Sequence, residues 1–150
     1  MKIYQFRLEA VLKLRKFKEE SCRMELGQLI MHLNKIDDQL AYEKNEIDSY
    51  YKIQEGALAN GMNGGQLQAF PMLVAAKESN IRLLNRDKVH QERLVEEKKQ
   101  ELAVVRGELK VIENLKEKDF DTYKKALNKE IDQKVEEQTQ IWMQHRDKKA

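Results

Sequence analysis

Hydrophobic residues recur along the first part of the chain in alternating steps of three and four. The apolar or aromatic members of this stripe, here called the seam, are Leu8, Leu12, Cys22, Leu26, Leu29, Leu33, Ile36, Leu40, Ile47 and Tyr50. Its polar members are Arg15, Glu19, Glu43 and Gln54. A seven-residue repeat of this kind is typical of an α-helix with one narrow apolar face. Because such a helix does not bury that face alone, the pattern predicts a partner helix.

A second stripe with the same spacing begins at Ile81. It continues through Leu84, Lys88, Gln91, Val95, Lys98, Leu102, Val105, Leu109 and Ile112. Past Ile112 we expect the stripe to shift by about one residue, which changes the supercoil of a coiled coil locally. The expected positions there are Phe120, Leu127, Ile131, Val135, Gln138 and Trp142.

The two stripes are separated by the uncharged stretch 56–76, which holds four of the six glycines and the single proline, Pro71. Glycine ends a helix at little cost, and proline is accommodated in the first turn of a following helix. The fold prediction is therefore all-α, a long antiparallel two-helix coiled coil (α-hairpin). We expect a single coiled-coil domain over 1–150, with helix one over about 5–57, a turn over about 58–70 and helix two over about 71–146.

The predicted arms have unequal lengths. If the turn centres near residue 63, position n faces about 127 − n, Leu8 lies near Asp119, and residues beyond about 122 have no partner in the hairpin. Apolar residues nevertheless continue there at Tyr123, Leu127, Ile131, Val135 and Trp142. An uncovered apolar stripe favours binding of another molecule. Fraying, self-association and a longer pairing are the alternatives.

Residues for catalysis or for metal binding do not form a pattern. The three histidines, His32, His90 and His145, are far apart and lack the spacing of a metal site. Cys22 falls on the seam, which predicts a small buried hydrophobe, and no phosphate-binding loop is found. A two-helix hairpin also lacks the concave pocket of an enzyme. We expect a protein that is not an enzyme and that uses no cofactor or metal.

Charge and hydropathy narrow the classes of partner. The 28 basic and 26 acidic residues give a net charge of +2, which creates no strong field for nucleic acid. The start of the chain has no apolar core of a signal peptide, and the glycines and amides of 56–76 argue against a membrane span. A single cysteine fits a reducing cytoplasm. We therefore expect neither nucleic-acid binding nor membrane insertion.

Two segments carry a resemblance to a known family. The segments are "YQFRLEAVLKLRKFKEE" at 4–20 and "RGELKVIENLKEKDFDTYKKALNKEIDQ" at 106–133. Both resemble the signatures of the flagellar export protein family FliJ, and the chain length and the turn near residue 60 also fit. The resemblance implies a cytoplasmic component of the flagellar type III export apparatus, peripheral to its membrane-embedded part. It also implies a coiled coil similar to the stalk of rotary ATPases.

The resemblance further implies partners and contact residues. Family members insert the joined ends of the hairpin into the hexameric ring of the export ATPase, contact the cytoplasmic domain of the export gate and escort export chaperones. Carried over, the ATPase-binding residues are Arg7, Arg15, Lys16, Asp132, Gln133 and Gln138. The gate-binding residues are Phe70, Leu73, Val74 and Ile81. Lys77 departs from the family pattern, which has an apolar residue at that place, and packing of the hairpin tip is the other interpretation of the gate set.

Two other functions remain open at this stage. The chain also fits the equivalent stalk of a virulence-type secretion injectisome, or a structural coiled coil that associates with itself. The sequence leaves undecided which chaperones are carried, the oligomeric state, and the order of the chain beyond about residue 122.

Overall fold

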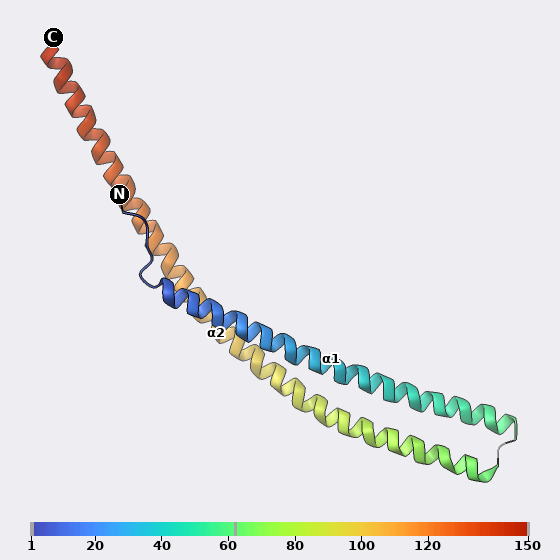
Figure 1. Ribbon diagram of the computed structural model, residues 1–150. Coiled ribbons are helices and arrows are strands. Elements are labelled where there is room, and N and C mark those ends of the chain that lie inside the picture. Colours follow the sequence, from blue (N-terminus) through green and yellow to red (C-terminus); the bar gives the residue numbers. More distant parts are fainter. Residues whose placement is uncertain (1, 62, 150) are drawn as a thin grey trace. The chain divides into compact units, whose positions relative to one another are not determined.

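The computed structural model describes residues 2–61 and 63–149, so Met1, Met62 and Ala150 of the predicted domain lie outside the described residues. Two helices, α1 (Glu9–Ala59) and α2 (Gly64–Lys149), make up the described secondary structure and pack against each other with opposite chain directions (Figure 1). The predicted all-α hairpin is confirmed. The chain divides into two compact units, one of Met1–Glu19 with Val104–Ala150 and one of Glu20–Ala103. Both helices pass through both units, so this division does not test the predicted single coiled-coil domain, which stays a prediction.

Burial in both units follows the seam of α1 and the facing stripe of α2, which begins at Phe70. The two facing stripes are together called the seam from here on. In Glu20–Ala103 the buried side chains are Cys22, Ile36, Leu40, Val74, Val95 and Leu102, and in the other unit they are Leu12 and Ile112. All other seam positions predicted between Leu8 and Gln54 and between Ile81 and Ile112 are half-buried. A two-helix interface buries one stripe from each helix and leaves the flanks in water, which explains why so few residues are fully covered.

Ion pairs across the helices fix the register of the hairpin. Asp37 pairs with Lys88, and Glu19 pairs with Arg106, so position n faces about 125 − n instead of the predicted 127 − n. The difference arises because the turn is centred between Ala59 and Gly64, slightly before residue 63. As a consequence Asp119 lies beside Tyr4, whose hydroxyl is 3.1 Å from its carboxylate, and not beside Leu8.

The turn is shorter than predicted, because α2 begins at Gly64, seven residues before the expected start at 71. Gly61 adopts a φ of 82°, a left-handed conformation that glycine tolerates without strain. Asn63 then caps α2, since its side-chain oxygen Oδ1 accepts a hydrogen bond of 2.9 Å from the backbone N–H of Gln66. Pro71 consequently lies inside α2 and beyond its first turn, where it removes one backbone hydrogen bond.

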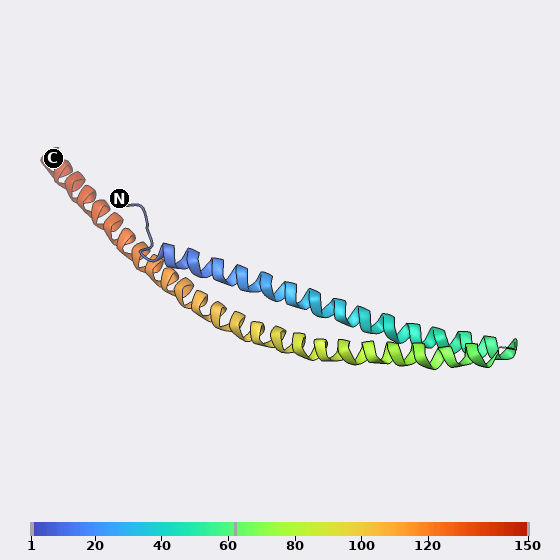
Figure 2. The ribbon, with the colours of Figure 1, turned by 60° about the horizontal axis from the view of Figure 1, so that its bottom comes forward.

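Residues 2–8 are not helical, whereas the sequence predicts helix one from about residue 5. Residues 2–8, here called the strap, lie beside α2 in both views of the ribbon (Figures 1 and 2). A hydrogen bond of 3.2 Å from the N–H of Glu9 to the carbonyl of Phe6 closes the turn that leads into α1. The strap extends the covered part of α2 beyond the point that α1 itself reaches.

Beyond Leu127, α2 continues without cover. Residues 128–149, here called the tail, are all exposed, and no other described segment lies beside them in Figures 1 and 2. After Ile112 the half-buried residues are Lys116, Tyr123 and Leu127. Lys116 and Tyr123 keep the spacing of the seam, whereas Leu127 lies one residue beyond the next seam position, 126. The expected one-residue shift is therefore seen at Leu127, while Phe120, also expected on the shifted stripe, is exposed. Cover ends near Leu127 instead of near 122 because the strap reaches further than a helix of the same residues.

Candidate partner-binding surfaces

The residues predicted to meet the export ATPase from the first arm lie in the unit of Met1–Glu19 with Val104–Ala150. Arg7, on the strap, and Lys16, on α1, are exposed. Arg15 is half-buried, and its Nη1 donates a hydrogen bond of 2.7 Å to the backbone carbonyl of Glu108. Arg15 therefore already joins α1 to α2, whereas Arg7 and Lys16 are available to a partner.

The ATPase residues predicted from the second arm lie on the tail. Asp132, Gln133 and Gln138 are exposed, as are the apolar tail residues. The latter are Ile131, Val135, Ile141, Trp142 and Met143. In the register above Arg7 faces about position 118, and Asp132 is 14 residues further along α2, or about 20 Å at the rise of a helix. The structure therefore places the two predicted groups one after the other along α2, not face to face.

The predicted gate-binding residues divide between the seam and the surface. Val74 is 8% exposed, and Phe70 and Ile81 are half-buried on the same stripe, facing α1. Leu73 is the exposed member of the set, with 45% of its side chain accessible. Three of the four residues thus take part in packing of the hairpin tip, and only Leu73 presents an apolar surface to a partner.

Lys77 is a half-buried charge on the stripe of Phe70, Val74 and Ile81, at the place where the resemblance implies an apolar residue. Its Nζ lies 3.2 Å from Oε2 of Glu43, another polar seam position, and 5.5 Å from the centroid of the Tyr42 ring. The hydrogen bond with Glu43 raises the pKa of Lys77 above its ordinary value. The two charged seam residues therefore compensate each other, which the sequence pattern of either arm alone did not indicate.

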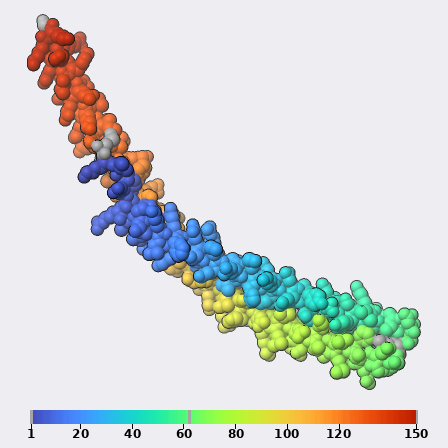
Figure 3. All heavy atoms as spheres, viewed as in Figure 1, coloured from blue at the N-terminus to red at the C-terminus, as the bar shows by residue number. Residues whose placement is uncertain are grey.

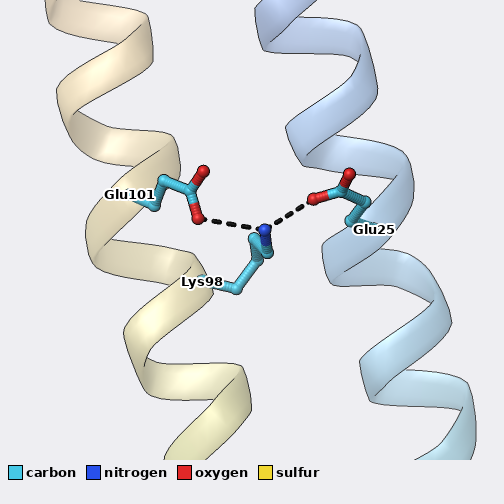
Figure 4. A network of polar contacts seen from close by, with 3 residues as sticks. All are labelled: Glu25, Lys98 and Glu101. Atoms are coloured by element: carbon cyan, nitrogen blue, oxygen red, sulfur yellow. Dashed lines mark hydrogen bonds and ion pairs between the residues drawn. The ribbon is translucent and has the colours of Figure 1, made fainter.

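The same arrangement recurs at Lys98, where one ammonium lies between two carboxylates (Figure 4). Its Nζ is 2.5 Å from Oε2 of Glu25 on α1 and 2.9 Å from Oε2 of Glu101 on α2. Hydrogen bonds to Glu25 and then Glu101 raise the pKa of Lys98 well above its usual range. Among the described residues two buried side-chain oxygens accept no well-aligned hydrogen bond: Oε2 of Glu43, which is instead ion-paired with Lys77, and Oε1 of Gln91.

An aromatic cluster joins the strap to α2, and sequence reasoning missed it. The ring centroid of Tyr4 is 5.0 Å from that of Phe120, edge to face, and 5.2 Å from that of Tyr123. Burial, and then the hydrogen bond with Asp119, raises the pKa of Tyr4. Tyr123 donates a hydrogen bond of 2.7 Å to the carbonyl of Lys2. The register places Tyr4 opposite about position 121. The aromatic residues Phe120 and Tyr123 on either side of that position were the sequence signal that could have predicted the cluster.

Within residues 2–61 and 63–149, no three His, Cys, Asp or Glu side chains are grouped so that they could hold a metal ion. Neither α1 nor α2, as far as each is described, contains a segment apolar enough to cross a bilayer.

Two helices of opposite direction, packed along one apolar stripe with compensating charges, define the class as an antiparallel coiled-coil hairpin. A family model described as "Flagellar FliJ protein" matches residues 4–146, and the chain therefore belongs to this family, as the two quoted segments indicated. Membership implies a component of the flagellar export apparatus, from a family of non-enzymatic proteins. Neither a curated protein nor a solved structure was found to match the chain.

Proposed function

We propose that this chain is a non-catalytic, stalk-like regulator of the flagellar export ATPase. The tail of α2, together with the strap, enters the ring of the ATPase hexamer and promotes its assembly and its hydrolysis of ATP. The segment around the turn contacts the cytoplasmic domain of the export gate, and the protein escorts export chaperones. It acts in the cytoplasm, beside the membrane-embedded part of the apparatus, without binding nucleic acid or entering the bilayer.

The observation that carries this proposal is the uncovered tail. Its apolar residues are exposed on a helix that is otherwise paired, and Figure 3 shows no other described segment against it on the visible face. Exposed apolar stripes on helices are covered in complexes by a partner. The predicted contacts Asp132, Gln133 and Gln138 lie among these apolar residues, so a partner that covers the stripe also meets the polar set.

The positive charge of the strap and of the first turns of α1 supports the same proposal. The strap and the first turns of α1 expose Lys2, Arg7, Lys13, Lys16 and Lys18. Basic side chains at the rim of an interface steer an acidic partner and raise the association rate more than the affinity. Acidic loops lining the ATPase ring are the partner surface that this charge suits.

ATP hydrolysis by the purified export ATPase, measured with and without this protein, tests the proposal. We expect saturating protein to raise the rate and the fraction of assembled rings. Val135→Asp, which places a charge on the tail stripe, should lower the stimulation several-fold, since charges at the centre of an apolar interface are strongly unfavourable. Val135 is 55% exposed, so the substitution should leave the hairpin folded.

Val89→Asp is the matched control, because Val89 is also an exposed valine of α2, with 59% of its surface accessible, but lies in the unit Glu20–Ala103. It should stimulate the ATPase as the natural chain does. Unchanged hydrolysis at saturating protein would refute the ATPase role. Binding of the gate domain and of purified chaperones to the same preparation checks the other two partners, and absence of binding removes each from the proposal.

A further inference from the structure

A groove of about 380 Å³ lies between the strap and α2, at the point where cover of α2 ends. It is lined by Lys2 from the strap and by Tyr123, Ala126, Leu127 and Glu130 from α2. The three central residues give it an apolar floor, and Lys2 and Glu130 give it a charged rim. Lys2 therefore gives the groove one wall from the strap, and the other lining residues give it a wall from α2.

One side chain of the strap, Tyr4, makes both polar and ring contacts with α2, and Phe6 of the strap is half-buried as well. The hydroxyl of Tyr4 is 3.1 Å from Oδ2 of Asp119 and 3.4 Å from the carbonyl of Lys116, and its ring packs on Phe120 and Tyr123. The neighbouring strap residues Ile3, Gln5 and Arg7 are exposed. Because aromatic packing and the hydroxyl bonds converge on Tyr4, its removal should release the strap from α2.

We propose that Tyr4 is a positioning residue: it docks the strap on α2 and thereby builds a groove that accepts a large apolar side chain of a partner helix. The partner side chain is flanked by a carboxylate that meets Lys2. Tyr123 contributes from the other side, because its hydroxyl holds the carbonyl of Lys2 at 2.7 Å. The groove is thus the first contact point on α2 that the chain leaves to another molecule.

Continuity with the seam determines the kind of occupant. Tyr123 keeps the seam spacing of Ile112 and Lys116, Leu127 lies one residue beyond the next seam position, and both are half-buried. In the register above α1, which begins at Glu9, reaches only to about position 116, so no described helix packs on Tyr123 and Leu127. The groove therefore lies where the next turns of a packed helix would sit, and a helix with an apolar stripe has the matching shape. This inference rests on the proposed function in taking the export ATPase as the protein that supplies this helix.

The first experiment fills the groove. Ala126→Phe places a ring in the groove from an exposed position of α2, and Ala103→Phe places the same ring on an exposed position of the unit Glu20–Ala103. Affinity for the purified export ATPase is measured by titration for both variants and for the natural chain. Ala126→Phe should weaken binding about tenfold or more, as expected for a blocked anchor pocket, while Ala103→Phe should bind as the natural chain does.

The second experiment tests the positioning role without any partner. Arg7 is exposed on the strap, and trypsin needs several residues around its cleavage site in an extended, accessible conformation. We therefore expect cleavage after Arg7 to become faster when the strap leaves α2, so that an increase in rate reports strap opening. Tyr4→Ala should raise this rate about tenfold relative to the natural chain, a typical effect of losing a local tertiary anchor. Tyr4→Phe, which keeps the ring contacts but loses both hydroxyl bonds, should fall between them. Tyr51→Ala, at an exposed tyrosine of α1, is the control and should have no effect.

The two readouts together separate positioning from a general loss of structure. Ala126→Phe should lower affinity without changing cleavage at Arg7, whereas Tyr4→Ala should change both. Equal binding by Ala126→Phe and Ala103→Phe would overturn the groove as a docking site while the proposed function stands. Equal cleavage of Tyr4→Ala and the natural chain would overturn the role of Tyr4. If the natural chain itself does not bind the ATPase, the proposed function fails, and with it the occupant named here.

Discussion

The seam within Glu20–Ala103 and the tail of α2 have similar sequences and opposite environments. Both carry an apolar residue every three or four positions between charged residues, yet Val74, Val95 and Leu102 of the seam are buried and Val135 of the tail is 55% exposed. The difference is the presence of α1 along one and its absence along the other. Apolar residues spaced by three and four positions thus show that a helix needs a partner, but they do not show whether the partner helix belongs to the same chain.

The charges of the two regions differ in the same way. In the seam Lys98 lies between Glu25 of the other helix and Glu101 of its own helix. In the tail Lys134 is 3.8 Å from Glu130, a local pair one turn away. Pairs between helices depend on the register, whereas a pair within one turn forms in any isolated helix. The seam charges therefore specify how the hairpin closes, and the tail charges do not.

The largest expected effect on the free energy of unfolding comes from truncating an isoleucine, and the same truncation can be made in each region. Ile36 is 5% exposed in the seam, and Ile141 is 65% exposed in the tail. Ile36→Ala should lower the free energy of unfolding by about 2–4 kcal/mol, since it removes buried methylene groups and leaves a cavity. Ile141→Ala should change it by less than about 0.5 kcal/mol. Urea denaturation followed by circular dichroism measures both.

A loss of comparable size at Ile141 would contradict the comparison, because it would mean that the tail is covered in the isolated protein. Sedimentation of the natural chain over a range of concentrations then identifies the cover: self-association appears as a mass that rises with concentration.

Much of the hairpin was predictable because its physics is local and periodic. The positions from Leu8 to Gln54 were identified from spacing alone, and each is buried or half-buried. The ends of the helices were less predictable. Asn63 caps α2 eight residues before Pro71, the predicted start of that helix, because a single side-chain hydrogen bond decides the helix boundary and leaves no periodic signal in the sequence.

The candidate surfaces were predictable to a smaller extent. The uncovered stripe beyond the end of α1 followed from unequal arm lengths. The strap did not, because the stripe that predicts helix one begins only at Leu8, and the contact of Tyr4 with Phe120 joins residues more than one hundred positions apart. Whether Arg15 is available to a partner also depended on a three-dimensional contact, its bond to the carbonyl of Glu108.

The next expected effect concerns the charges that close the seam. Asp37 and Lys88 are 2.8 Å apart across the helices. Lys88→Asp should lower the melting temperature by less than Ile36→Ala does, and the double variant Asp37→Lys with Lys88→Asp should recover most of that loss, as a pairwise interaction requires. Lys134→Asp in the tail is the control and should leave the melting temperature unchanged. Failure of the double variant to recover would show that the pair does not contribute to the register.

The smallest expected effect is a dependence on alkaline pH. Hydrogen bonds to carboxylates raise the pKa of Lys77, Lys88 and Lys98 above the ordinary value of 10.5. A lysine whose pKa is higher in the folded chain contributes stability that is fully present below pH 10.5 and is lost as the pH rises through the folded pKa. The melting temperature should therefore decline above about pH 10.5, beyond the decline that deprotonation of the surface lysines causes.

Lys98→Met isolates the contribution of one such residue. Methionine fills a similar volume at a seam position, so the variant should be no less stable than the natural chain at neutral pH, because an apolar residue often replaces a paired charge without loss. Its melting temperature should then decline less steeply between about pH 10 and pH 12, since the ammonium that loses its proton there is absent. The difference between the two curves cancels the surface lysines that both proteins share. Parallel curves would mean that the contacts of Lys98 with Glu25 and Glu101 add nothing to the closed hairpin, and the seam would then be held by its apolar residues alone.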